Sequence, residues 1–208
     1  PHWKGKVVVT DVTQSMEPYL DEVLMWHLLS ARQGEAVQYL FFNDGDRLPE
    51  SQKAIGQTKG FHTCQGTQQG LDTVLASMAA AVAAGDGGTP PENDLEALLH
   101  GAQFLAPGKE LILIADSHSP IRDIELLAQL QVPVRIILCG AEARNRRYRY
   151  LKPDVNEEYL NLARRTGGSI HTLHQDLLNL GQLPEGERVQ VGRFWYLLRH
   201  GHFIKLRY

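Results

Sequence analysis

The sequence predicts an α/β protein with a mostly parallel β-sheet covered by helices on both faces. Two observations favour this fold. Short apolar runs such as Val7-Val8-Val9 and the segment 109–116 (KELILIAD) indicate strands that are buried on both sides. Segments with apolar residues at helical spacing lie between these runs, and such an alternation of strands and helices is typical of parallel sheets.

The elements follow from these patterns in order along the chain. Strands are expected at 4–11, 35–44, 60–64, 109–116, 132–140 and 168–174. Helices are expected at 20–31, 71–82, 95–102, 121–130 and 155–163, and the glycines at 85, 87 and 88 end the second of them. His27 lies on the apolar stripe of the first helix, which favours a packing role over a ligand role.

The last part of the chain predicts a separate unit. Two strand-like runs flank Arg199-His200-Gly201-His202, a pattern that indicates a β-hairpin. Because an isolated hairpin is barely stable in water, it has to pack on the rest of the protein or on a partner. We therefore expect a main domain over residues 1–180 and a β-hairpin extension over residues 181–208 that packs on it.

Composition limits the function classes. The chain has 208 residues, of which 43% are hydrophobic, so it can fill a core. Its net charge of −3 argues against a dedicated nucleic-acid binder, and no apolar run approaches the roughly 20 residues of a membrane span. For Cys64 and Cys139, free thiols are favoured over a disulfide. The first residue is Pro1, so we expect a processed or shortened chain, with export slightly favoured over the cytoplasm.

Oxygen-bearing side chains follow two of the predicted strands. Asp11, Thr13 and Ser15 come after the first strand at alternate positions, and Asp116 ends the segment 109–116. The glycine-rich loop 85–94 precedes the helix before that strand. If the two strands are neighbours, these segments meet at the carboxyl edge of the sheet, where ligands bind in such folds. Carboxylates and hydroxyls suit Mg²⁺, Mn²⁺ or Ca²⁺ better than zinc, so we expect a divalent cation there.

The sequence Asp11-Val12-Thr13-Gln14-Ser15 resembles the D-x-[ST]-x-S signature of von Willebrand factor A (vWA) domains. The resemblance extends to Thr89 in the glycine-rich loop and to Asp116, and it covers about residues 5–175 in element order. It implies a Rossmann-like vWA fold with a six-stranded sheet and a short antiparallel edge strand at 60–64. It also implies a metal-ion-dependent adhesion site (MIDAS) in which Thr13, Ser15 and Thr89 contact the metal and Asp11 and Asp116 act through water. The open metal position would take a Glu or Asp carboxylate of a partner.

Two alternatives remain open for this region. Glu92 is similar to the acidic metal ligand of integrin β-subunits, which also follows a proline, but an acid in the first turn of a helix is the simpler interpretation. A capping and turn network without a metal would also place Asp, Ser and Thr in such loops. His118, two residues after Asp116, could lie at the rim of the site, although a surface role is favoured.

A basic segment follows the predicted strand at 132–140. Residues 143–152 (ARNRRYRYLK) contain Arg144, Arg146, Arg147 and Arg149. Because this segment leaves a strand at its carboxyl end, we expect it to flank the metal and to steer an acidic partner. A solvated loop without a role is an equal alternative, and a nucleic-acid partner is less favoured.

These features predict a non-enzymatic protein that binds a protein or peptide ligand through a divalent metal. An assembly factor that works with an AAA ATPase is the main alternative, since some vWA proteins act in this way. A Mg²⁺-dependent phosphohydrolase is less favoured, because such enzymes place a second acid two residues after the first, where this chain has Thr13.

Overall fold

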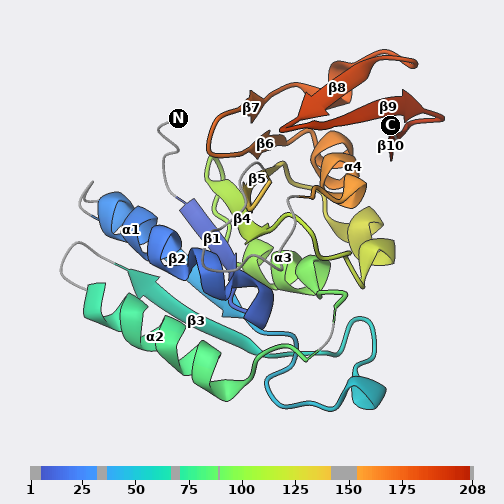
Figure 1. The fold of residues 1–208 in the computed structure, drawn as a ribbon. Coiled ribbons are helices and arrows are strands. Elements are labelled where there is room, and N and C mark those ends of the chain that lie inside the picture. Colours follow the sequence, from blue (N-terminus) through green and yellow to red (C-terminus); the bar gives the residue numbers. More distant parts are fainter. Residues whose placement is uncertain (1–5, 32–36, 67–70, 89, 142–153, 207–208) are drawn as a thin grey trace.

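A computed structural model describes residues 6–31, 37–66, 71–88, 90–141 and 154–206 of the chain. A seven-stranded sheet with the strand order β3-β2-β1-β4-β5-β6-β7 forms its centre (Figure 1). The strands of this sheet are β1 (Lys6–Asp11), β2 (Val37–Phe42), β3 (Phe61–Gly66), β4 (Glu110–Asp116), β5 (Val134–Cys139), β6 (Ser169–His171) and β7 (Asp176–Leu177). The helices are α1 (Leu20–Ala31), α2 (Leu71–Ala84), α3 (Asp94–Ala102) and α4 (Glu157–Thr166).

Strand β1 lies between β2 and β4 and runs parallel to both, with Thr10 opposite Ile114 of β4. The two strands whose carboxyl ends carry Asp11 and Asp116 are therefore neighbours, as the sequence prediction required. Strand β3 is the expected antiparallel edge strand. The sheet has seven strands where the resemblance implied six, because Asp176–Leu177 adds a short antiparallel strand beside β6.

Apolar residues cover both faces of the sheet. Successive residues of a strand point to opposite faces, so Val7 and Val9 join one core cluster and Val8 joins the other. Helices α1 and α2 cover the face that includes Val8 (Figure 1), and α3 and α4 contribute to the other cluster. No helix in the described part of the chain has the length and apolar character needed to cross a membrane.

The segment 121–130 differs from its prediction. It forms a six-residue 3₁₀ turn, η3 (Ile124–Gln129), and not an α-helix. Its first residues pair with the segment before α3 and so cannot begin a helix. Ile121 forms a parallel bridge with Glu92, and the Arg122 N–H donates to the Glu92 carbonyl at 2.7 Å. Other 3₁₀ turns are η1 (Gln14–Tyr19), η2 (Glu50–Gln52) and η4 (Leu180–Gln182).

The C-terminal unit is a three-stranded antiparallel sheet, where the sequence predicted a two-stranded hairpin. Its strands are β8 (Arg188–Val191), β9 (Phe194–Arg199) and β10 (His202–Lys205), in the order β10-β9-β8. The predicted turn at His200-Gly201 joins β9 to β10. The predicted first strand is divided because Gly192, with φ of 55°, forms a second tight turn that places Val191 opposite Phe194. One face of this sheet packs on α4 and buries Tyr196, Leu198 and Phe203.

The two cysteines are free thiols on different strands, Cys64 on β3 and Cys139 on β5. Both are half-buried in the same apolar layer, and burial raises the pKa of Cys139 to about 12. A thiol with such a pKa is inert at neutral pH.

Candidate functional site

The structure brings Asp11, Thr13, Ser15 and Asp116 together at the carboxyl ends of β1 and β4. Asp11 Oδ1 accepts the backbone N–H of Thr13 at 2.8 Å, which turns the chain sharply after the strand. The Thr13 and Ser15 hydroxyl oxygens lie 3.1 Å apart, and Ser15 Oγ donates to Asp116 Oδ2 at 2.5 Å. The alternate spacing of these residues therefore directs their oxygens to one place.

Asp116 is held as a carboxylate by the loop that follows it. Its oxygens accept the N–H groups of His118 at 2.7 Å and Ser119 at 3.0 Å, the Ser119 hydroxyl at 2.9 Å, and a contact from His118 Nδ1 at 2.9 Å. Burial opposes its ionisation, but the hydrogen bonds from His118 and Ser15 outweigh burial and lower its pKa to about 2. His118 therefore lies at the rim and orients Asp116.

Asp11 is in the opposite electrostatic situation. It is fully buried, and burial together with the charge of Asp116 raises its pKa well above the ordinary range. Within the described residues, its Oδ2 atom has no hydrogen-bond partner. Ionisation of a buried carboxyl group with an unpartnered oxygen costs free energy, and a cation beside that oxygen would offset the cost.

A second group of acids adjoins Asp11 and consists of Asp44, Glu92 and Asp94. Burial raises the pKa of Glu92 to about 11, and the charges of Asp11 and Asp44 and a hydrogen bond to Asp44 act in the same direction. Burial also raises the pKa of Asp44 and of Asp94. Oxygens of all three lack a hydrogen-bond partner in the described part of the chain. Glu92 precedes α3, which begins at Asp94, so it points into this cluster and is not an acid on the helix surface.

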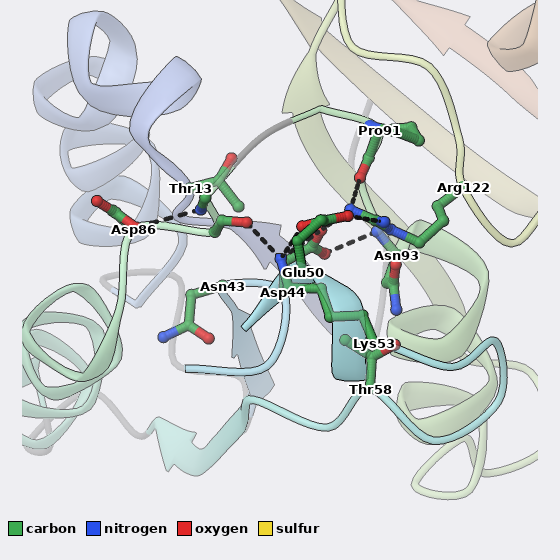
Figure 2. A network of polar contacts seen from close by, with 12 residues as sticks. Thr13, Asn43, Asp44, Glu50, Lys53, Thr58, Asp86, Pro91, Asn93 and Arg122 are labelled. Carbon is green, nitrogen blue, oxygen red and sulfur yellow. Dashed lines mark hydrogen bonds and ion pairs between the residues drawn. The ribbon is translucent and has the colours of Figure 1, made fainter. Parts of the chain in front are cut away.

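Two cationic side chains, Lys53 and Arg122, lie near Asp44 of this group (Figure 2). Lys53 Nζ lies 4.0 Å from Asp44 Oδ2 and 3.1 Å from Glu50, and it donates to the Gly87 carbonyl at 2.5 Å. Arg122 lies 3.7 Å from Asp44 Oδ2, pairs with Glu50 and donates to the Pro91 carbonyl at 2.6 Å. Both cations therefore tie the glycine-rich loop to the loop after β2 and offset part of the buried negative charge.

The sequence did not indicate most of the residues in this second group of acids or the cations beside it. Asn43-Asp44-Gly45 is a turn signal in the sequence, but Asp44 also accepts the Asn93 N–H at 2.7 Å and so fixes the entry to α3. Asp123 accepts the N–H groups of Leu95 at 3.1 Å and Glu96 at 2.6 Å, and so caps α3 from another segment. The available signal was that Asp44 follows β2, the neighbour of β1. No sequence pattern indicated a role for Lys53, because its contacts with Asp44 and Gly87 join segments that are distant along the chain.

Several predicted site residues lie outside the described residues. Thr89 is one, so the choice between Thr89 and Glu92 as a ligand stays a prediction. The partner-steering residues Arg144, Arg146, Arg147 and Arg149 are the others. The glycine-rich loop is described except for residue 89, and its Asp86 carbonyl accepts the Gln14 N–H at 3.0 Å. This contact places the loop beside the first segment of the site.

The donor set fits a hard cation. The described residues contain no group of three or more His, Cys, Asp or Glu side chains arranged to hold a metal ion. The group at β1 and β4 is of another kind, because it combines two carboxylates, Asp11 and Asp116, with the hydroxyls of Thr13 and Ser15. Such oxygens suit Mg²⁺, Mn²⁺ or Ca²⁺. The unpartnered Asp11 Oδ2 atom supports this fit.

Comparison with solved structures supports the class of fold. The chain is similar to a von Willebrand factor type A protein from Catenulispora acidiphila, with a TM-score of 0.52 and 12% sequence identity over 83% of this chain and 39% of that chain. The sequence itself matches no protein-family model and no curated protein. The chain therefore has a vWA-like Rossmann fold, and it spans about two fifths of the length of this similar protein.

Proposed function

We propose that this chain is a non-enzymatic binding module whose partner is held through a divalent metal, Mg²⁺ or alternatively Mn²⁺ or Ca²⁺. The observation that carries this proposal is the buried, unpartnered Oδ2 of Asp11 beside two hydroxyls and the ionised Asp116. Asp11, Thr13, Ser15 and Asp116 are the proposed metal residues, with Thr89 or Glu92 supplied by the glycine-rich loop.

The residues of the chain have distinct roles in this proposal. Thr13 and Ser15 offer neutral oxygens. The Ser15 hydroxyl can donate its hydrogen to Asp116 while its oxygen lone pairs face the site. His118 and Ser119 keep Asp116 ionised and fixed. A bound divalent metal would supply a Lewis-acidic position for a carboxylate oxygen of a partner. The four arginines between 144 and 149 remain the proposed groups that speed the approach of an acidic partner.

An interaction role is favoured over phosphoester chemistry by the residue two positions after Asp11. A phosphohydrolase with an aspartate nucleophile needs a second acid there for proton transfer, and Thr13 cannot act as one at neutral pH. Steady hydrolysis of a generic phosphoester that stops in Asp11→Asn would contradict this part of the proposal.

Titration calorimetry on the metal-stripped protein tests the metal site. We expect one weak Mg²⁺ or Mn²⁺ site, with binding at least about tenfold weaker in Asp11→Ala, because loss of a charged hydrogen-bonding group at the site costs well over about 1.4 kcal/mol. Asp21→Ala, which removes an exposed acid from the first turn of α1, is the matched control and should bind as wild type. Equal binding by Asp11→Ala and wild type would remove the MIDAS interpretation.

The partner carboxylate can be tested with acetate as a probe. Amide NMR signals of Thr13 and Ser15 should shift on titration of acetate into the Mg²⁺-loaded protein, because the open metal position takes a carboxylate oxygen. The same titration in the presence of a chelator should leave these signals unchanged. Identical shifts under both conditions would show that acetate binds elsewhere.

A further inference from the structure

The β8–β9–β10 sheet has a second face that points away from α4. Because side chains alternate along a strand, the residues between the buried Tyr196, Leu198 and Phe203 lie on this outer face. They include Trp195 and Leu197 of β9 and Ile204 of β10. Trp195 is 38% exposed and Ile204 is 43% exposed, so the described residues leave this face open to solvent.

The register of the strands gathers the apolar residues of the outer face into one block. Ile204 lies directly opposite Leu197, and the Leu206 N–H donates to the Trp195 carbonyl at 2.8 Å, which places these two residues opposite each other. The four side chains therefore form two adjacent cross-strand pairs. An apolar block of this kind on an otherwise polar face is a candidate interaction site.

The charged side chains on the outer face of the three strands have one sign. They are Arg188 and Arg199, whereas the acidic Glu185 lies beside the β9–β10 turn and accepts the Gly201 N–H at 3.2 Å. On the outer face, Arg188 lies opposite Leu197 on β8, and Arg199 lies opposite His202 beyond the other end of the apolar block. Both arginines are exposed. A partner that complements this face therefore carries acidic groups next to apolar ones.

The edges of this small sheet are partly closed to added strands. On β10, Asn161 of α4 accepts the Phe203 N–H at 2.7 Å and donates to the Phe203 carbonyl at 3.4 Å. On β8, the Gln175 side chain donates to the Gln190 carbonyl at 2.7 Å. These side chains occupy backbone groups that an incoming strand would use. A partner is therefore expected on the face of the sheet.

We infer that the outer face of the β8–β9–β10 sheet binds an acidic amphipathic segment of a partner protein. Such a segment places apolar side chains on Trp195, Leu197, Ile204 and Leu206 and acidic side chains against Arg188 and Arg199. Leu197 and Leu206 are half-buried. They form a floor for a complementary apolar surface and are too recessed to enter a lipid layer. Three of the four apolar residues are aliphatic, which favours a peptide over stacked nucleic-acid bases.

This inference is independent of the proposed metal site, so its test is done in a chelator. A displayed library of random peptides of about 16 residues, long enough for an extended or helical segment, is selected on the full chain. We expect enrichment of sequences that combine Asp or Glu with Leu, Ile or Phe. Selection of peptides without acidic enrichment, or no enrichment at all, would overturn the inference.

Variants then locate the binding. Trp195→Ala, and separately Arg188→Glu with Arg199→Glu, should each weaken a selected peptide at least about tenfold, and the charge reversal should remove the salt dependence. Met25→Ser with Arg47→Glu changes an exposed apolar side chain and an exposed arginine elsewhere and should bind as wild type. The inference fails if the peptide binds all variants equally. It also fails if phosphatidylserine vesicles or a single-stranded oligonucleotide bind wild type more tightly than the peptide does.

Discussion

At the scale of single residues, His27 shows how burial changes chemistry. It is 1% exposed on α1, and its ring meets Trp26, Tyr39 and Phe41 edge-on at centroid distances of 4.9–5.8 Å. Burial lowers its pKa from 6.5 to about 3, so the ring is neutral at physiological pH. The sequence prediction of a packing histidine is confirmed.

His27 should make stability depend on pH. The unfolded state takes up a proton on His27 near pH 6.5, whereas the folded state does so only near pH 3. The contribution of neutral His27 to the unfolding free energy is therefore fully present above pH 6.5 and is lost as the pH falls toward 3. The slope is about half of 1.4 kcal/mol per pH unit at pH 6.5 and approaches the full value about one pH unit lower. Between about pH 7.5 and 5.5, wild type should lose about 1.4 kcal/mol of unfolding free energy relative to His27→Leu.

Urea unfolding of both proteins at the two pH values measures this difference. Other titrating groups, such as Asp123 with its pKa raised by burial to about 7, cancel in the comparison because both proteins contain them. A constant difference between wild type and His27→Leu across this range would show that His27 is accessible to protons in the folded state.

At the scale of elements, the glycine-rich loop after α2 packs tightly against the first segment of the candidate site. Gly87 has φ of 85°, and a Cβ atom there would lie 2.7 Å from Thr13 Cγ2. Gly88 has a similar φ of 77°, but the nearest atom to a Cβ atom there is Lys53 Nζ at 3.6 Å. The two glycines therefore share backbone strain but differ in their contact with Thr13.

Gly87→Ala and Gly88→Ala form a matched pair. Both should lose about 1–2 kcal/mol of stability, because an L-residue is strained at positive φ. Gly87→Ala should in addition displace Thr13 and weaken Mg²⁺ binding about tenfold or more, since a metal site depends on ligand positions. Calorimetric titration of both variants tests this. Equal metal affinity in the two variants would mean that Thr13 does not contact the metal.

At the scale of the whole molecule, the candidate site concentrates buried negative charge that folding has to accommodate. Asp11, Asp44, Asp94 and Asp116 are fully buried, and Lys53 and Arg122 offset the charge of Asp44 in part. Such an arrangement stores free energy that a cation can release. Stability of the fold and occupancy of the site are therefore linked.

Metal should raise the melting temperature of wild type by mass action. At a metal concentration of ten times Kd the gain is about 1.4 kcal/mol, or about 3–6 °C for a chain of this size. Asp11→Asn should lose this increase. In a chelator it should melt at least as high as wild type, because its amide keeps the acceptor for the Thr13 N–H and removes a charge beside Asp116.

Scanning calorimetry of wild type and Asp11→Asn, with Mg²⁺ and in a chelator, measures the metal-dependent increase in melting temperature and the melting temperature of the metal-free protein. If Asp11→Asn melts well below wild type in the chelator, the Asp11 charge stabilises the metal-free fold, and the account of stored electrostatic free energy is wrong. If Asp11→Asn keeps the metal-dependent increase, the metal is bound elsewhere.

The sequence by itself determined the order of elements and the first layer of the candidate site. Apolar periodicity is a local property, so β1, β4, α2 and the turn at His200-Gly201 could be read directly. The same holds for Asp11, Thr13 and Ser15, whose spacing of two residues is fixed by the chain. Asp116 followed from one added assumption, that its strand is a neighbour of β1.

The tertiary structure alone decided the features that depend on contacts between distant segments. Asp44, Lys53 and Arg122 meet across loops, and Asp123 caps a helix that is not its own. The segment 121–130 has a helical pattern, but its pairing with Glu92 prevents a full helix. The outer face of the β8–β9–β10 sheet depends on a turn at Gly192 that brings Arg188 opposite Leu197. Such pairings depend on the free energy of the whole fold, which no local window of sequence contains.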